Sequence, residues 1–314
     1  MAGMQALVTG AAGFIGSTLV DGLLAAGHRV RGVDCFMPFY PEADKRQNLS
    51  GALAHPDFEL VEVDLRTTEV GALLDGVDTV FHLAAQAGVR PSWAEGFEDY
   101  VTLNILATQR LLEASRDRAV RRVVYASSSS VYGQAARYPT AEDDLPAPHS
   151  PYGVTKLAGE HLCGLYGANH GVATVSLRYF TVYGPRQRPD MGFHRFFSAV
   201  LAGRPVVQYG DGLQTRDFTF VADAARATAD AGARGIPGRV YNIGGGSRVT
   251  LLEVFDLIGK VSGRPVIIDH QGPQKGDMRD TYADTTLARA DLGFAPSVTL
   301  EQGLTAMHQW FLTR

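Results

Sequence analysis

The sequence predicts an α/β fold, a doubly wound parallel sheet with a smaller α/β lobe after it, and three observations support this. Short aliphatic runs alternate with amphipathic helical patterns through the first half of the chain. A glycine-rich turn joins the first aliphatic run to the first helix. After Gly184 the alternation becomes irregular, and Pro, Gly and Arg recur at residues 185–190, 203–205 and 210–216. Regular alternation of strand and helix implies a parallel sheet that is covered on both faces.

The individual elements follow from the length and the period of the apolar pattern. Short aliphatic runs are predicted as buried strands, and they span residues 4–8, 28–34, 58–64, 79–83, 123–126 and 172–178. Longer amphipathic stretches are predicted as helices, and they span residues 14–26, 67–74, 97–116 and 151–170.

Composition excludes several classes of protein. The 314 residues are 45% hydrophobic and 20% charged, which is ordinary for a globular protein of the cytoplasm, the expected location. A net charge of −4 gives no bulk attraction to nucleic acid or to an anionic membrane. No apolar run has the length of a membrane span, and no basic segment at the start predicts a signal peptide. The nine histidines lack zinc-like spacing, and Cys35 and Cys163 are expected as free thiols, so no metal site is predicted.

The glycine-rich turn predicts a dinucleotide site. Gly10-Ala-Ala-Gly13-Phe-Ile-Gly16 follows the first strand and opens the first helix, where a side chain would block the approach of a pyrophosphate. The free N–H groups of the helix N-terminus favour phosphate. Asp34 lies 18 residues after Gly16, close to the spacing at which a carboxylate accepts a hydrogen bond from a ribose 2′-OH. This Rossmann-type pattern favours NAD over NADP, although Lys45 and Arg46 leave the choice open.

A tyrosine and a lysine four residues apart provide a candidate general base. Tyr152 and Lys156 lie on one face of a predicted helix. A free tyrosine has a pKa of about 10, and a fixed ammonium beside it would lower that value toward the working range. Upstream, Ser127-Ser-Ser-Ser130 follows a predicted strand, so its hydroxyls should point into the crevice at the carboxyl end of the sheet.

These motifs together resemble the extended short-chain dehydrogenase/reductase family, in its nucleotide-sugar epimerase/dehydratase branch. The resemblance runs along the whole chain and includes, beside the glycine turn and the Tyr152/Lys156 pair, Asp64-Leu65, His82-Leu-Ala-Ala85, Asn104, the serine run, Arg178-Tyr-Phe-Thr181 and Arg216-Asp-Phe218. It implies that Tyr152 is the base, that Lys156 holds the nicotinamide ribose, and that Ser128 hydrogen-bonds the reacting sugar oxygen.

The resemblance also implies an NAD-binding domain over residues 1–178 and a nucleotide-sugar lobe over residues 179–314, with parts near 215–235 returning to the first domain. The residues expected to bind NAD are Gly10, Gly13, Phe14, Ile15, Gly16, Asp34, Asp64, Leu65, Leu83, Ala84, Ala85, Asn104, Tyr152, Lys156 and Tyr179. A homodimer through the helices at 97–116 and 151–170 is implied as well.

Three stretches resemble uronate 4-epimerases more closely than the rest of the branch: residues 85–90, 181–190 and 192–196. A C6 carboxylate needs a cationic, hydrogen-bonding pocket, and Arg90 and Arg188 are suitable donors. Either arginine could instead be a solvated loop charge or a phosphate contact, and Pro91 departs from the pattern of the relatives. The residues expected to bind the UDP-sugar are Arg90, Ser128, Ser129, Ser130, Tyr152, Thr181, Arg188, Phe193, Arg216 and Asp277.

The serine run also bears on the outcome of the reaction. A uronate oxidised at C4 is a β-keto acid that can lose CO2. Decarboxylating relatives place a glutamate just before Val-Tyr-Gly and dehydrating relatives an Asp-Glu pair, whereas this chain has Ser129-Ser130. We therefore expect NAD-dependent epimerisation of UDP-glucuronate to UDP-galacturonate. The alternatives are a UDP-glucuronate decarboxylase, a UDP-glucose 4-epimerase and, outside enzymes, an NAD-binding sensor.

Overall fold

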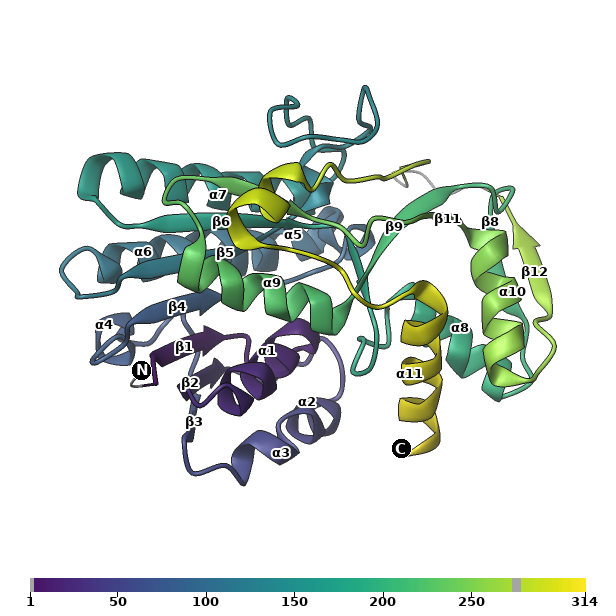
Figure 1. Ribbon diagram of the computed structural model, residues 1–314, viewed down its shortest axis with the longest axis horizontal. Helices are drawn as coiled ribbons and strands as arrows, with labels where there is room; N and C mark the ends of the chain where they lie inside the picture. The colour runs from purple at the N-terminus through teal and green to yellow at the C-terminus, as the bar shows by residue number, and fades with distance from the viewer. Residues whose placement is uncertain (1–2, 273–277) are drawn as a thin grey trace.

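The structure is a computed structural model that describes residues 3–272 and 278–314, so Asp277 lies outside the described residues. A seven-stranded sheet with the strand order β10-β6-β5-β4-β1-β2-β3 forms the core of the larger part of the molecule, at the left of Figure 1. Every pairing in this sheet is parallel. The strands are Gln5–Thr9 (β1), Arg29–Asp34 (β2), Phe58–Glu62 (β3), Thr79–His82 (β4), Arg122–Ser128 (β5), Thr174–Tyr179 (β6) and Val240–Ile243 (β10). The predicted fold class is confirmed.

Helices cover both faces of the sheet. Successive side chains of a strand point to opposite faces, and both faces of this sheet are apolar. Val8 and Phe81 pack with α1 (Phe14–Ala25) and α9 (Val221–Arg234), which lie side by side in Figure 1. On the opposite face, Leu7 and Val80 pack with α6 (Ala107–Ser115) and α7 (Pro151–His170). Shorter helices are α2 (Glu42–Asn48), α3 (Ser50–Leu53), α4 (Val70–Leu73) and α5 (Phe97–Tyr100).

Two predicted helices differ from those observed. The helix predicted over 97–116 is α5 and α6 joined by a π-helical turn, Val101–Leu106, which carries Asn104. The helix predicted over 67–74 shortens to α4, because Glu69 accepts a hydrogen bond from the Gly71 N–H and so caps its start.

The chain after residue 179 contributes both to the large sheet with its helices and to the smaller lobe. Strand β10 pairs with β6, and α9 packs against α1, so the large sheet takes its last strand from the second half of the sequence. Strand β10 was missed because it has only four residues and lies among glycines. The domain division expected at residue 178 stays a prediction.

The described part of the smaller lobe, at the right of Figure 1, contains two short sheets and the helices α8, α10 and α11. Strand β9 (Thr215–Phe220) pairs in parallel with β7 (Thr181–Tyr183) and antiparallel with β11 (Arg248–Thr250). Strand β8 (Val206–Tyr209) pairs with β12 (Ile268–Gln271). The helices are α8 (Gly192–Leu201), α10 (Leu251–Ser262) and α11 (Leu300–Leu312), and they enclose a core that includes Phe193, Phe197, Val254, Ile258 and Leu304.

The last two helices begin where the sequence provides a capping box. At the start of α10, the Thr250 hydroxyl accepts from the Glu253 N–H, and the Glu253 carboxylate accepts from the Thr250 N–H. Thr299 and Gln302 repeat the arrangement at α11. Each box satisfies N–H groups that a helix start otherwise leaves unpaired. Among the described residues, no helix has the length and apolar character that crossing a membrane requires.

Candidate active site

The glycine turn is shaped by close packing at two of its glycines. Gly10 has a φ of +69°, and a Cβ added to it would lie 2.8 Å from the Ala84 nitrogen. A Cβ on Gly16 would lie 2.1 Å from the Gly10 oxygen. Gly13 is the N-cap residue of α1 and lines a cavity at the carboxyl ends of the strands, so the helix N-terminus opens toward that cavity, which is called the first cavity below. These N–H groups suit an anionic pyrophosphate.

Asp34 lies in the wall of the same cavity, at the end of β2. Its carboxylate accepts hydrogen bonds from the Ala12 N–H at 3.1 Å and the Phe36 N–H at 2.8 Å. Two backbone donors thus fix the carboxylate, and a carboxylate oxygen has further lone pairs for a ribose hydroxyl.

Lys45 and Arg46, the two cations that left the choice between NAD and NADP open, have different contacts in the structure. Lys45 is buried in the cavity wall, and its Nζ donates to the Met37 carbonyl at 2.8 Å. Arg46 forms ion pairs with Glu42 at 2.6 Å and Glu62 at 2.9 Å. Lys45 is therefore a cavity residue that the sequence did not assign, while the charge of Arg46 is balanced by carboxylates.

The ends of the next strands complete the wall. Residues predicted to bind NAD and found there, besides the glycines and Asp34, are Phe14, Ile15, Asp64, Leu65, Leu83, Ala84, Ala85, Tyr152, Lys156 and Tyr179. The Asp64 carboxylate pairs with Arg66 at 2.7 Å, and this hydrogen bond holds the pKa of Asp64 below its usual value.

Asn104, predicted to bind the cofactor, lies behind this wall. Its Oδ1 accepts from the Gln86 N–H at 2.7 Å, and its Nδ2 donates to the Gln86 carbonyl at 3.0 Å and to the Thr155 hydroxyl at 3.0 Å. The side chain is almost fully buried by these contacts. Asn104 therefore positions the loop after β4 against α7, and Gln86, which does line the cavity, is its neighbour on the cavity side.

Helix α7 brings Tyr152 and Lys156 into the cavity. It begins at Pro151, and the Ser150 hydroxyl caps it by accepting from the Gly153 N–H at 3.1 Å. Lys156 donates from Nζ to the Ala126 carbonyl at 2.8 Å. Burial lowers the pKa of Lys156 to about 8, against the opposing charge of Glu160.

The electrostatics of Tyr152 differ from the sequence prediction. Burial raises the pKa of the Tyr152 phenol, and the groups that act in the other direction are the Ser128 hydroxyl and the Arg188 charge. Lys156 was predicted to lower the pKa, but its ammonium is directed to the Ala126 carbonyl. In the protein alone, burial therefore outweighs the groups that favour the phenolate.

The serine run forms a tight turn after β5. The Ser128 hydroxyl caps the 3₁₀ turn Ser129–Val131 by accepting from the Ser130 N–H at 3.1 Å, and it lies 3.1 Å from the Ser130 hydroxyl. Ser129, predicted to bind substrate, lines a small separate cavity beside Tyr132 and Asp280. Ser129 is thus separated from the first cavity, whose wall contains Ser127 of the serine run.

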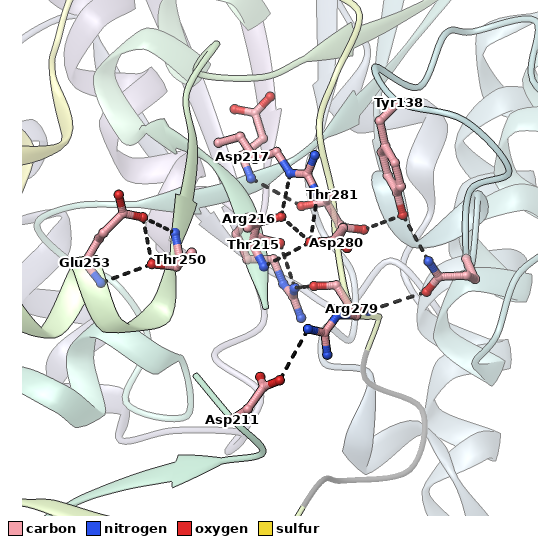
Figure 2. Close-up of polar contacts among 12 residues, drawn as sticks. Tyr138, Asp211, Thr215, Arg216, Asp217, Thr250, Glu253, Arg279, Asp280 and Thr281 are labelled. Atoms are coloured by element: carbon pink, nitrogen blue, oxygen red, sulfur yellow. Dashed lines mark hydrogen bonds and ion pairs between the residues drawn. The ribbon is translucent and has the colours of Figure 1, made fainter. Parts of the chain in front are cut away.

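A second large cavity lies between the loop after β4 and the smaller lobe. Four of the predicted substrate residues line it: Arg90, Thr181, Phe193 and Arg216. The Arg90 guanidinium lies over the Tyr209 ring, 4.8 Å from its centroid. Arg216 donates to the carbonyls of Thr215 at 2.8 Å and Arg279 at 3.0 Å, as Figure 2 shows.

Arg279 and Asp280 form hydrogen bonds with β9 beside Arg216 (Figure 2). The Asp280 carboxylate accepts from the Thr215 N–H at 3.3 Å, and the Asp280 carbonyl accepts from the Tyr138 hydroxyl at 2.9 Å. Arg279 pairs with Asp211 at 3.3 Å. These contacts join three separate parts of the chain next to Arg216, and Tyr138 and Asp280 line the small cavity that also contains Ser129.

Arg188 lies in the wall of the first cavity, together with Tyr152. Its guanidinium donates to both oxygens of Asp190, each at 3.0 Å, and lies over the Phe39 ring, 5.6 Å from its centroid. Arg188 and Arg90 therefore occupy different cavities, and Arg188 carries a counter-ion that the sequence did not predict.

The family described as the NAD dependent epimerase/dehydratase family has a model that matches residues 6–244. The chain belongs to this family. It is 42% identical to the UDP-glucuronic acid 4-epimerase of Bacillus cereus, whose structure in complex with UDP-glucuronic acid and NAD covers 99% of both chains with a TM-score of 0.95.

Two curated relatives cover almost the whole chain. It is 44% identical over 304 residues to an uncharacterized UDP-glucose epimerase, YtcB, of Bacillus subtilis, covering 96% of each chain. It is 35% identical over 331 residues to a probable UDP-glucuronate 4-epimerase of Rhizobium meliloti, covering 98% of this chain and 97% of the relative. The predicted resemblance is confirmed, and the protein is an NAD-dependent nucleotide-sugar 4-epimerase.

The first cavity of the epimerase fits NAD. Its walls contain an open helix N-terminus where a pyrophosphate would lie, a carboxylate at the end of β2, and a tyrosine and a lysine from α7. Side chains on Gly10 and Gly16 would break the turn that shapes this site. Within the residues that the structure describes, no group of three or more metal-ligating side chains occurs.

Proposed function

We propose that the epimerase converts UDP-glucuronate to UDP-galacturonate through a 4-keto intermediate. The observation that carries the proposal is the position of Arg188 beside Tyr152 in one cavity wall, because a cation next to the base is where a C6 carboxylate would be needed. The similarity to the Bacillus cereus enzyme, which binds UDP-glucuronic acid and NAD, supports the same assignment.

In the proposed mechanism, Tyr152 removes the proton from O4 and Ser128 donates a hydrogen bond to that oxygen. NAD, when bound, supplies the oxidant for C4 and the reductant that restores it from the opposite ring face after the sugar has turned. Lys156 holds the nicotinamide ribose. Burial raises the pKa of Tyr152 in the protein alone. The positive charge of an oxidised nicotinamide bound beside the phenol would lower that pKa and so favour the phenolate.

The serine turn supports epimerisation of the keto intermediate over its decarboxylation or dehydration. Ser130, at the position where decarboxylating relatives carry a glutamate, has a neutral hydroxyl that lies 3.1 Å from the Ser128 hydroxyl. Hydroxyls and a guanidinium can hold a carboxylate ionised and in place, and they provide no acid or base for loss of CO2 or water. The decarboxylase alternative is therefore disfavoured.

A UDP-glucose 4-epimerase is the second candidate, because Asp190 already neutralises Arg188. A neutral hydroxymethyl group would leave that ion pair intact, whereas a uronate carboxylate must compete with Asp190 for the guanidinium. The curated relative from Bacillus subtilis is an uncharacterized UDP-glucose epimerase. We give uronate preference because Arg188 is held against Phe39 in the wall of the cavity.

The test compares kcat/KM for UDP-glucuronate and for UDP-glucose under the same conditions. The proposal requires a clear preference for UDP-glucuronate, with UDP-galacturonate as the product. A preference for UDP-glucose would assign the second function instead.

We also propose that the epimerase forms a homodimer through the face that joins α6 and α7. Leu106, Val154 and Leu165 are each more than 40% exposed there, which is unusual for large apolar side chains. Light scattering after gel filtration would give the mass of two chains, and a monomer at micromolar concentration would contradict the assignment.

A further inference from the structure

A buried ion pair lies directly behind the serine turn. The Glu160 carboxylate of α7 accepts two hydrogen bonds from the guanidinium of Arg178 on β6, at 2.9 Å and 2.8 Å. Both side chains are 5% exposed. A pair taken out of water in this way is weak evidence for stability, because desolvation offsets most of its attraction. Its presence calls for another explanation.

The two partners of the pair hold the two ends of the serine turn. Before the turn, the Ser127 hydroxyl donates to the Glu160 carboxylate. After the turn, Arg178 donates to the Tyr132 hydroxyl at 2.7 Å, and that hydroxyl donates to the Asn242 amide oxygen at 2.7 Å. The residues between these anchors, Ser128, Ser129 and Ser130, are therefore fixed from behind by one pair of charges.

The same pair is tied to the helix that carries the base. Glu160 follows Lys156 by one turn of α7, and Lys156 donates to the Ala126 carbonyl, immediately before Ser127. Glu160 also favours the charged form of Lys156 against the effect of burial. The serine turn and the Tyr152–Lys156 face of α7 thus share one set of buried contacts.

We propose that the Glu160–Arg178 pair is a positioning unit that fixes the serine turn against α7 and thereby keeps the C6 carboxylate of the keto intermediate in place. The inference rests on the proposed function, because only a uronate has that carboxylate. Neither residue touches the substrate, and both act through Ser127, Tyr132 and Lys156.

The chemical consequence concerns a side reaction of the intermediate. In a 4-keto uronate the bond between C5 and C6 can break, with its electron pair moving onto the C4 carbonyl as an enolate. CO2 then leaves and C5 takes a proton from water, which gives a UDP-ketopentose. The cleavage requires the C5–C6 bond to stand perpendicular to the carbonyl plane, so a turn that keeps the carboxylate close to that plane suppresses it.

The principal test is Glu160→Gln, which keeps the shape of the side chain and removes its charge. We expect the fraction of turnovers that release CO2 from UDP-glucuronate to rise at least about fivefold over the wild type. We also expect amide hydrogens of residues 128–132 to exchange at least about fivefold faster in the protein without substrate. The exchange measurement follows the turn itself and does not depend on turnover.

The matched control is Asp223→Asn on α9. Asp223 is also a buried carboxylate with an arginine partner, Arg226, at 2.7 Å, and it accepts from the N–H groups of Ser297 and Val298. This control should lower Tm without changing CO2 release or exchange at residues 128–132. If Glu160→Gln does not fold, Tyr132→Phe replaces it, because that change removes one anchor and keeps the ring.

Three outcomes decide the matter. Faster exchange at the turn with more CO2 supports the proposal. A lower Tm with unchanged exchange and CO2 release, as in the control, overturns it and leaves the pair a structural contact. If the wild type does not turn over UDP-glucuronate, the proposed function and the role of the pair in retaining CO2 are both refuted. Faster exchange in Glu160→Gln would then still show that the pair positions the turn.

Discussion

The cavity that contains Tyr152 and the cavity that contains Arg90 are built in different ways. Residues at the ends of successive strands of one parallel sheet form the first, together with the start of α7. The second is assembled from the loop after β4, from β7, β8 and β9 of two short sheets, and from α8. The carboxyl ends of parallel strands meet at one edge, so the order of the strands brings most of the first set together, and Arg188 joins it from the loop after β7. The second set meets only because the smaller lobe packs as it does.

The largest expected effect is in the first cavity. Tyr152→Phe should lower kcat by at least about a hundredfold while KM for the UDP-sugar changes little, because general-base catalysis is lost and the ring remains. Steady-state kinetics with either sugar measures this. Tyr166→Phe, on the same helix but hydrogen-bonded to Glu113 at the surface, is the control and should keep its activity. Near-native turnover in Tyr152→Phe would assign the base to another group.

The stability of the protein should depend on pH through Asp217, a buried carboxyl on β9. Burial raises the pKa of this carboxyl to about 6, against hydrogen bonds from the backbone N–H groups of Ala283 and Gly246. The folded state therefore favours the protonated form, and this contribution is complete below the unfolded pKa of about 4 and is lost as pH rises through about 6.

Asp217→Asn stays neutral, so it isolates that contribution. From pH 4 to pH 7 the unfolding free energy of the wild type should fall relative to the variant by up to about 3 kcal/mol, from 1.36 kcal/mol per pKa unit. Urea unfolding at both pH values measures it. A difference between the two proteins that is independent of pH would show that Asp217 ionises normally.

Arg188→Ala sharpens the comparison between the cavities. A charge-assisted contact is worth roughly 1.5–3 kcal/mol, so kcat/KM for UDP-glucuronate should fall by about ten- to a hundredfold, while that for UDP-glucose barely changes. Arg90→Ala, in the second cavity, is the matched change. If Arg188→Ala loses both sugars equally and Arg90→Ala alone alters their ratio, Arg90 is the partner of the carboxylate.

The smallest effect should be on the cofactor. Asp34→Ala should weaken NAD binding by on the order of tenfold and reduce discrimination against NADP, since the acceptor for the ribose hydroxyl and its charge both disappear. Calorimetry with each dinucleotide measures this, and Arg46→Ala, at the surface, should leave both affinities close to the wild type. A wild type that prefers NADP would contradict the role of Asp34.

What the sequence could predict follows the same division. The glycine turn, Asp34 and the Tyr152/Lys156 pair depend on local spacing, and all of them line the first cavity as expected, although burial raises the pKa of Tyr152 where Lys156 was predicted to lower it. Asn104 could not be placed from its motif, because a π-helical turn and Gln86 decide where its amide lies.

The remaining differences come from contacts between distant parts of the chain. Asp190 as a partner of Arg188, the separate cavity of Ser129 and the Glu160–Arg178 pair all depend on how loops and strands meet in three dimensions. No periodicity or spacing in the sequence encodes these contacts. They are also the contacts that bear most on the choice of sugar and on the outcome of the reaction.

The most direct test of the account is to incubate the wild-type protein with UDP-glucuronate and to follow the products by proton NMR until they stop changing. We predict a mixture of UDP-glucuronate and UDP-galacturonate, with hardly any UDP-pentose. Abundant UDP-xylose would contradict the assignment of the serine turn to epimerisation. No conversion of UDP-glucuronate by a protein that converts UDP-glucose would contradict the assignment of the uronate.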